Sequence, residues 1–541
     1  MPHIYKIHAM ADGSRSSSAG GMPTNAAPAP LRWLMPSVTD LLFVAILATL
    51  VFTPLSVKLL NDAGTGWHIR TGQLIVATHQ VPHFDSFSSQ INKPWFAWEW
   101  LYDIVLGSLE RWCGLNGAVW FTAIVIATVF AWTFRLLIVS GTHLLNALVL
   151  TLLATGGSMI HFLARPHVLS WLFVIAWFRI LESTESENNN WNQRRKLWLL
   201  PFLMLIWVNV HGGFLLGFVL QAIYWLGSLW SWWNLNPSRM EESFQKIVAG
   251  KRSRDLTFVG LASLAASLVN PYGWKLHQHI LGYLSNRFLM NHIEEFQSPN
   301  FHNIAPQCFL IILLITLAVV AARRRQLKLS QILLMLFAAY AGIYSARNIP
   351  TSSILLVLII GPLLPSFSAT QFFQRMLTVD SQQRSHLWPL AATLATFLIA
   401  ASSGHAASRP WMDAHFSPNR MPVTAVNYIE NNNVQGPILS PDYWGGYLIY
   451  RLYPRNRVVI DDRHDFYGEP FLKSYLTMIH VEPGWEQFLK WRAACIVLPK
   501  SSALAAVLTR TPEWKSVYSD DLAIIFIPTQ EPEDSDRALK P

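Results

Sequence analysis

The stretch "SVTDLLFVAILATLVFTPLSVKLLNDAGTGWHIRTGQ", residues 37–73, turns from apolar to polar within a few residues. Its first part is an apolar run of about 24 residues, and about 20 suffice to cross the hydrocarbon core of a membrane. Asp62, Trp67, His68 and Arg70 follow directly. The stretch predicts a first membrane span that places an acid, an imidazole and a guanidinium at the lipid surface.

The composition extends this prediction to most of the chain. Of 541 residues, 52% are hydrophobic and only 13% are charged, whereas a soluble domain usually has about 25% charged residues. The 24 Trp and 15 Tyr suit positions at the water–lipid boundary. We therefore expect an α-helical polytopic membrane protein with about 11 transmembrane helices.

The net charge of +9 does not indicate nucleic-acid binding, because the basic residues gather in short loops between apolar runs, at 194–196, 246–254 and 323–328. Such clusters are typical of cytoplasmic loops. They predict a cytoplasmic N-terminus and an extracytoplasmic C-terminus. The three isolated cysteines indicate neither a disulfide framework nor a zinc site.

Three regions follow from these patterns. Residues 1–36, rich in Ser, Ala, Pro and Gly, are expected to be a disordered cytoplasmic segment. Residues 37–403 form the transmembrane module, with outer loops 61–95 and 271–306. Residues 404–541 are expected to form an extracytoplasmic α/β domain, with strands at "RVVIDD", "AACIVLP" and "LAIIFIP" and a helix at "EPGWEQFLKWR". Whether "WFAWEWLYDIVLGSLERW" lies along the outer surface or crosses the membrane is open.

Polar residues collect at the predicted outer ends of the spans. Such groups are costly at membrane depth and tend to face a cavity or a site. The cations are Arg70, Arg165, Lys275, Arg287 and Arg347, and the acids are Asp62, Asp85, Glu99, Asp103, Glu294 and Glu295. Guanidinium groups bind phosphate, and a carboxylate beside them can act as a base or a metal ligand. This combination suits group transfer from a phosphorylated lipid.

Two motifs carry a family resemblance. "DAGTGWHIRTGQLIVATHQVPHFDSFS", residues 62–88, resembles the first outer loop of GT-C glycosyltransferases, and "FLARPHVLSWLF", residues 162–173, is similar to a segment of the protein mannosyltransferase and aminoarabinose transferase branch. The oligosaccharyltransferase catalytic subunit shares the same layout of helices followed by an outer domain. His167 stands where that branch often has an acid, and no "WWD" signature occurs in the tail.

The resemblance implies a glycosyltransferase of a bacterial inner membrane that moves a sugar from a polyprenyl-phosphate donor to an extracytoplasmic glycan, lipid or protein. It implies Asp62 as the base or a metal ligand, with Mg²⁺ or Mn²⁺ held by Asp62 and Asp85 if any metal is bound. The donor phosphate would be bound by Arg70, Arg165, Arg287, Arg347 and Lys275. The pocket and acceptor site would include Trp67, His68, Asp85, Glu99, His167, His211, Asn270 and Glu294.

The tail offers a separate candidate. Asp461, Asp462, Arg463 and Asp465 follow a predicted strand, and Tyr443 or Trp444 precedes it. These residues could bind an acceptor glycan by hydrogen bonding and ring stacking, or form only a strand end and a solvated turn.

Simpler roles and other functions stay open. Asp62 could cap the helix that follows it, and Arg70 could reach lipid headgroups. A transporter or flippase of a lipid-linked or anionic solute is the main alternative, although no internal repeat is visible. A non-catalytic assembly subunit is another. The expected partners are membrane lipids and the polyprenyl-phosphate sugar, and nucleic acid is not expected.

Overall fold

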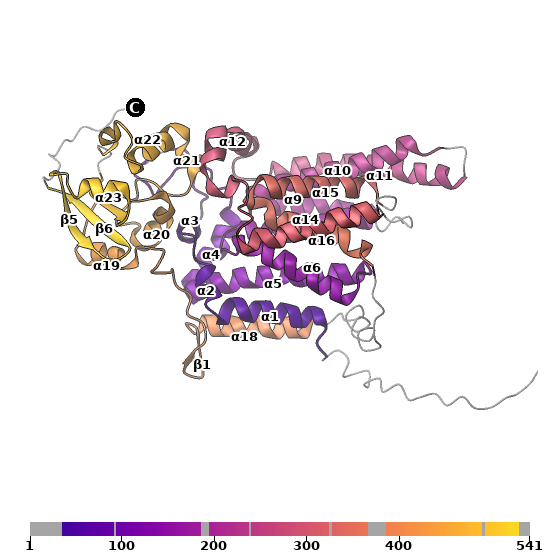
Figure 1. Cartoon of the computed structure of the whole chain (residues 1–541), viewed down its shortest axis with the longest axis horizontal. Coiled ribbons are helices and arrows are strands. Elements are labelled where there is room, and N and C mark those ends of the chain that lie inside the picture. Colours follow the sequence, from indigo (N-terminus) through magenta and orange to yellow (C-terminus); the bar gives the residue numbers. More distant parts are fainter. Residues whose placement is uncertain are drawn as a thin grey trace, which may run out of the picture.

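The chain forms a bundle of helices with a smaller α/β region at one end (Figure 1). The computed structural model describes residues 35–529, apart from 91–92, 186–193, 237–239, 324–326, 366–385 and 490–492. The predicted N-terminal segment 1–36 therefore lies almost wholly outside the described residues.

Five helices of the bundle are long and apolar enough to cross a membrane. They cover Leu115–Val139 (α5), Leu144–His161 (α6 and η2), Gly212–Asn234 (η4 and α10), Ile304–Ala322 (within α14) and Ala346–Leu363 (η7, α16 and η8). Shorter apolar helices are Val38–Phe52 (α1), Lys196–Trp207 (η3 and α9), Leu329–Tyr344 (α15) and Leu387–Ala401 (α18). The structure thus has a helical module of membrane type, while the predicted count of about 11 spans is not confirmed.

Helix α1 sets the start of the bundle. The Ser37 side chain accepts the N–H of Asp40, and the Asp40 carboxylate accepts the N–H of Ser37, which closes a capping box at the helix start. α1 packs against α5 and α18, and α1 and α18 run side by side in Figure 1. The chain then passes through the short α2 (Leu55–Lys58) into α3 (Gly64–Thr78). The polar helix α3 therefore follows the first apolar run and lies at the end of the bundle.

Helix α4 (Trp100–Cys113) packs closely against α3. A Cβ added to Gly72 would lie 1.7 Å from the carbonyl oxygen of Asp103, so only a glycine permits this approach. α4, which contains most of the segment 95–112, does not belong to the apolar helices named above.

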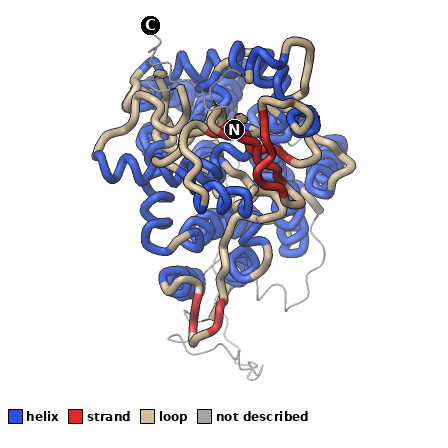
Figure 2. Tube along the Cα trace, turned by 90° about the vertical axis from the view of Figure 1, so that its left-hand side faces the viewer, coloured by secondary structure: helices blue, strands red, loops and turns tan. Residues whose placement is uncertain are grey.

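The C-terminal region contains a mixed four-stranded sheet, which Figure 2 shows together with a separate two-stranded hairpin. The strand order is β3 (Ile438–Leu439), β4 (Cys495–Pro499), β6 (Ala523–Pro528) and β5 (Trp514–Ser519). β3 and β4 are parallel, and the other neighbours are antiparallel. The buried residues of β4 and β6 form its core, which confirms the two strands predicted at "AACIVLP" and "LAIIFIP".

Two local predictions for this region are wrong. "RVVIDD" forms only isolated bridges at Val458, because the chain leaves the sheet and its acids turn into ion pairs described below. "EPGWEQFLKWR" forms only a short 3₁₀ helix, Trp485–Phe488, in its described part. Gly484 before it has a positive φ of 87°, which prevents a longer helix from starting earlier.

The C-terminal region docks on the bundle through glycines. Helix α20 (Asp442–Leu452) crosses α3. A Cβ on Gly446 would lie 2.3 Å from the carbonyl oxygen of Ala63, and one on Gly66 would lie 2.3 Å from the carbonyl oxygen of Gly446. Small residues at this crossing let the two backbones touch. The contact brings the tail of the chain against the loop that contains Asp62.

Candidate active site

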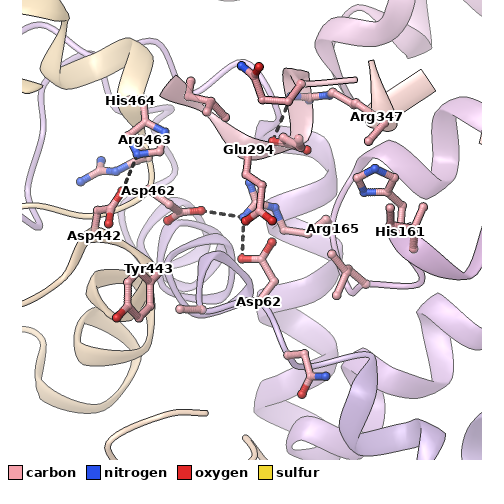
Figure 3. Close-up of a pocket in the computed structure, with 18 of the residues that line it drawn as sticks. Asp62, His161, Arg165, Glu294, Arg347, Asp442, Tyr443, Asp462, Arg463 and His464 are labelled. Carbon is pink, nitrogen blue, oxygen red and sulfur yellow. Dashed lines mark hydrogen bonds and ion pairs between the residues drawn. The ribbon is translucent and has the colours of Figure 1, made fainter. Parts of the chain in front are cut away.

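A cavity of about 990 Å³ lies between the end of the helical bundle and the C-terminal region (Figure 3). Its walls come from the segment around Asp62, the loop before α7 (His167–Ser183) with Arg165, and the outer loops around Glu294 and Arg347. The C-terminal region adds Asp462 and its neighbours. Polar groups from segments far apart in the chain therefore face one space.

The centre of the cavity is an ion-paired triad. Arg165 Nη1 donates to Asp62 Oδ1 at 2.9 Å and to Asp462 Oδ2 at 2.7 Å (Figure 3). Trp67 Nε1 donates to the other oxygen, Asp462 Oδ1, at 2.9 Å. Asp62 Oδ2 has no hydrogen-bond partner among the described residues, so this carboxylate keeps one oxygen for a ligand.

The local backbone places this triad. The Gly64 N–H donates to Asp62 Oδ1 at 2.8 Å, so Asp62 also caps the start of α3, as its sequence position suggested. Ala164 N donates to the carbonyl of Leu59 at 2.8 Å, which ties the Arg165 loop to the end of α2. A Cβ on Gly64 would lie 1.8 Å from Arg165 Nη1. A glycine is therefore needed for the guanidinium to reach Asp62.

The segment "DDRHD", residues 461–465, divides its side chains between two environments. Asp462, Arg463, His464 and Asp465 line the cavity. Asp461 is buried behind the cavity wall and receives Arg463 Nη2 at 2.7 Å. Arg463 Nη1 donates to Asp85 at 2.7 Å. Asp461 therefore serves to hold Arg463, and helix α21 (His464–Tyr467) begins two residues after Asp462.

Arg463 is a buried residue that links the C-terminal region to the loop containing Asp85. Its guanidinium lies 4.6 Å from the centre of the Trp95 ring and 5.0 Å from that of Phe466. Burial opposes ionisation of Asp85, but Arg463 and hydrogen bonds from Ser88 more than offset it and hold the pKa of Asp85 below its usual value. We infer that the predicted site residue Asp85 helps dock the two parts of the molecule.

A second acid–histidine pair lies on the C-terminal wall. His464 Nε2 and Asp442 Oδ2 are 2.7 Å apart (Figure 3). The Tyr475 hydroxyl donates to Asp442 Oδ1 at 3.1 Å. Burial lowers the pKa of His464, but the Asp442 carboxylate more than compensates and raises it above the usual value. The adjacent Tyr443 lines the cavity and is 56% exposed.

Glu99 lies in the cavity wall formed by the bundle. Its carboxylate oxygens are 3.7 Å from His68 Nε2 and 3.8 Å from His211 Nε2. Burial raises the pKa of Glu99 to about 7, although Arg165 and Arg347 act in the opposite direction. Glu99 is thus partly protonated near neutral pH and can donate a hydrogen bond to a ligand.

The cations of the cavity differ in their availability. Arg165 is shared by two carboxylates, and Arg347 Nη1 donates to Glu295 at 3.3 Å. Lys58 and Arg420 also line the cavity, and neither side chain has an ion-pair partner among the described residues. The sequence analysis missed both; the position of Lys58 four residues before Asp62 was the available signal.

Several predicted site residues lie elsewhere. Arg70 donates to the carbonyl of Tyr450, and Lys275 borders a separate, smaller cavity. Arg287 begins α13 (Arg287–His292) and is exposed outside the large cavity. Asn270 accepts the N–H of Tyr272 within a turn. His167 contacts the carbonyl of His161 behind the cavity wall. Their proposed roles stay predictions.

Asp62 and Asp85 are the predicted ligands of a divalent metal ion. Among the described residues, no group of three or more His, Cys, Asp or Glu side chains could hold a metal. Asp62 already accepts from Arg165 and Gly64, and Asp85 from Arg463 and Ser88. The contacts of Asp62 and Asp85 therefore do not fit a metal site shared by these two residues.

Comparisons with known proteins support the fold. No family model and no curated protein matches the sequence. Among solved structures, the oligosaccharyltransferase of Archaeoglobus fulgidus tethered with an acceptor peptide is similar with a TM-score of 0.52 and 12% identity, over 93% of this chain and 74% of that one. The chain therefore shares the fold of this oligosaccharyltransferase structure.

Two further structures are similar at lower TM-scores. The archaeal oligosaccharyltransferase AglB from Archaeoglobus fulgidus, in complex with an inhibitory peptide and a dolichol-phosphate, has a TM-score of 0.49 and 11% identity, over 85% of this chain and 69% of that one. ArnT from Cupriavidus metallidurans bound to undecaprenyl phosphate has a TM-score of 0.45 and 12% identity, over 92% and 98%. The assignment of the fold rests on the tethered structure.

Proposed function

We propose that the protein transfers a sugar from a polyprenyl-phosphate donor to an acceptor that enters the cavity from the side of the C-terminal region. The observation that carries the proposal is the Asp62 carboxylate, which lines a cavity of about 990 Å³. Its Oδ1 accepts from Arg165 Nη1 at 2.9 Å, and its Oδ2 has no hydrogen-bond partner among the described residues. A base beside phosphate-binding cations suits glycosyl transfer.

The lining of the cavity supports a donor with a phosphate head and an apolar tail. Lys58 and Arg420 offer cationic groups without carboxylate partners among the described residues, and Arg165 lines the same cavity. Met159 and Ile160 line the same cavity and are partly exposed. Two of the compared proteins were solved with dolichol-phosphate and undecaprenyl phosphate; here the class is inferred from the lining itself.

The reaction balances with groups of this chain. The acceptor hydroxyl oxygen attacks the anomeric carbon of the donor sugar and forms the new C–O bond. The bond from that carbon to the phosphate oxygen breaks, and its electron pair leaves with the polyprenyl phosphate. Asp62 Oδ2 takes the hydroxyl proton, and Arg165, Lys58 and Arg420 stabilise the charge on the leaving phosphate.

We also propose the predicted orientation and domains. His211 lies beside the cavity, and α10 runs from it to Asn234, after which the basic stretch 246–254 follows. A basic cluster at the far ends of the helices is typical of the cytoplasmic side. The cavity and the domain 404–541 would then be extracytoplasmic, and the module 37–403 would span a bacterial inner membrane.

The test uses the purified full chain in nanodiscs with a panel of undecaprenyl-phosphate sugars. Release of free undecaprenyl phosphate, measured by mass spectrometry, is the expected result. The main alternative, transport, is tested in proteoliposomes with the same lipids. Movement of the intact donor across the bilayer without bond cleavage would overturn the transferase and support a flippase.

A further inference from the structure

The C-terminal wall of the cavity carries an exposed aromatic ring that the transfer step does not use. Tyr443 lies in the first turn of α20 and is 56% exposed. Its neighbour Trp444 is 1% exposed, and its Nε1 donates to the carbonyl of Arg420 at 2.7 Å. Trp444 is therefore unavailable for stacking on a ligand. Tyr443, the other predicted stacking residue, presents its ring to the cavity.

The polar pair next to this ring is held rigidly. Asp442 receives the Tyr475 hydroxyl on its carboxylate, and its own backbone N–H donates to the same hydroxyl oxygen at 3.0 Å. His464 is oriented through Nε2 by the other carboxylate oxygen. Its Nδ1 has no partner among the described residues, although His464 lines the cavity. One ring nitrogen is thus positioned to exchange a hydrogen bond with a ligand.

We propose that Tyr443 and the Asp442–His464 pair form an acceptor subsite that binds a carbohydrate. A sugar ring has an apolar C–H face, which packs on an aromatic ring, and hydroxyl groups at its edge, which need directional polar partners. The proposal rests on the proposed function and specifies its acceptor. The three residues bind and orient the acceptor, and the proton of the reacting hydroxyl still goes to Asp62.

The shape of this wall favours a sugar over a peptide. An extended peptide is often bound by adding a strand to a free sheet edge. None of the described strands contributes a residue to the cavity lining, which on this side comes from the loops at 420–421 and 462–463 and from helices α20, α21 (His464–Tyr467) and α22 (Glu469–Ile479). A ring and a fixed imidazole are present instead.

The subsite is also tied to the donor side. Asp462 stands two positions before His464 and holds Arg165 at 2.7 Å. The same short segment therefore connects the acceptor wall with the guanidinium that faces the donor phosphate. A sugar on Tyr443 would therefore be oriented relative to the donor through the contact of Asp462 with Arg165.

The test measures sugar binding by saturation-transfer NMR on the detergent-purified full chain. The probes are methyl glycosides of glucose, galactose, mannose and arabinose, with glycerol as a non-ring control. We expect signals from at least one glycoside in the wild type. Tyr443→Leu and His464→Gln should each weaken binding about tenfold, as expected for the loss of one aromatic or polar contact.

Matched control variants lie in the same region but outside the cavity lining. Trp411→Leu removes an exposed aromatic ring, and His480→Gln removes an exposed imidazole. Both should bind the glycosides as the wild type does. Equal binding by Tyr443→Leu, no glycoside signal in the wild type, or selective binding of a Ser- or Asn-containing peptide at these residues would each overturn the sugar subsite.

A second measurement separates this proposal from the proposed function. Undecaprenyl phosphate should raise the thermal unfolding temperature of the wild type and of Tyr443→Leu equally, because the ring is not part of the donor site. A protein that binds glycosides but is not stabilised by undecaprenyl phosphate would contradict the donor class and leave the sugar subsite supported.

Discussion

Arg165 and Asp462 meet at 2.7 Å, although 297 positions separate them in the chain. Arg165 belongs to a loop of the helical bundle and Asp462 to the C-terminal region. The same guanidinium nitrogen also reaches Asp62, which follows the first apolar run. The triad is therefore formed only when the last quarter of the chain is docked on the bundle, and the cavity has its charged centre only in that state.

Replacing Asp462 should change the affinity for the donor phosphate. A phosphate that approaches Arg165 competes with two carboxylates, and burial raises the pKa of Asp462 to about 6 even though Arg165 opposes this. We expect Asp462→Asn to bind undecaprenyl phosphate about three- to tenfold more tightly, since removal of one competing charge amounts to up to about 1.4 kcal/mol. Microscale thermophoresis measures this. Weaker binding would show that Asp462 supports the phosphate site.

Asp62→Asn tests the base directly. The substitution keeps an oxygen for the Gly64 N–H but removes proton acceptance, so we expect the transfer rate to fall about 10²- to 10⁴-fold. The transfer rate is measured by the release of undecaprenyl phosphate, and size-exclusion chromatography shows whether the variant folds. The exposed acid Glu482 lies outside the cavity lining, and Glu482→Gln serves as the control. A variant with the turnover of the wild type would remove Asp62 from the mechanism.

Gly64→Ala tests the close approach of Arg165. The new methyl group would lie 1.8 Å from Arg165 Nη1 and 2.4 Å from Asp462 Oδ2, so the guanidinium must move. We expect transfer to fall at least about tenfold while the protein still purifies as a folded species, because side-chain ends shift more cheaply than backbone. Gly282→Ala in α12 (Trp274–Ser285) is the control, since an added Cβ there meets nothing within 4 Å. Full activity of Gly64→Ala would contradict the geometry of the triad.

The buried carboxyl Glu99 predicts a pH dependence of stability. Burial raises the pKa of Glu99 from 4.5 to about 7, so the folded state binds a proton more tightly than the unfolded state. The resulting stabilisation is complete below about pH 4.5 and is lost as the pH rises through 7, with a magnitude on the order of 3 kcal/mol at most.

Thermal unfolding of the detergent-purified protein between pH 5 and 8 measures this effect. The unfolding temperature of the wild type should decrease with rising pH, and Glu99→Gln should show a shallower decrease because its side chain stays neutral. Asp462 and His464, whose pKa values are also raised, contribute in the same direction and remain in both proteins. Identical slopes would mean that Glu99 does not titrate in this range.

The sequence predicted the features that depend on local pattern. The apolar run before Asp62 became α1 and α2, and the apolar strands at 493–499 and 522–528 formed the centre of the sheet. Asp62 and Arg165 were placed at the same end of the bundle because both follow or precede predicted spans. Their structural meeting at 2.9 Å agrees with that placement.

Contacts between segments far apart in the chain could not be predicted from local sequence pattern. Arg70 was assigned to phosphate, but it donates to Tyr450, a partner supplied by a helix 380 positions away. Trp444 was a stacking candidate and is buried, because the direction in which α20 faces is decided by its glycine contact with α3. Whether Asp461 or Asp462 faces the cavity depends on the backbone conformation just before α21, which composition does not specify.

The backbone contact between Gly66 and Gly446 has a consequence for how the protein matures. The ribosome synthesises α20 and the acidic segment after it only when more than four-fifths of the chain already exists. Until the C-terminal region packs on α3, the cavity lacks the part of its wall that this region contributes. A premature stop codon before residue 440 would therefore yield a protein that can insert into the bilayer but has no catalytic activity.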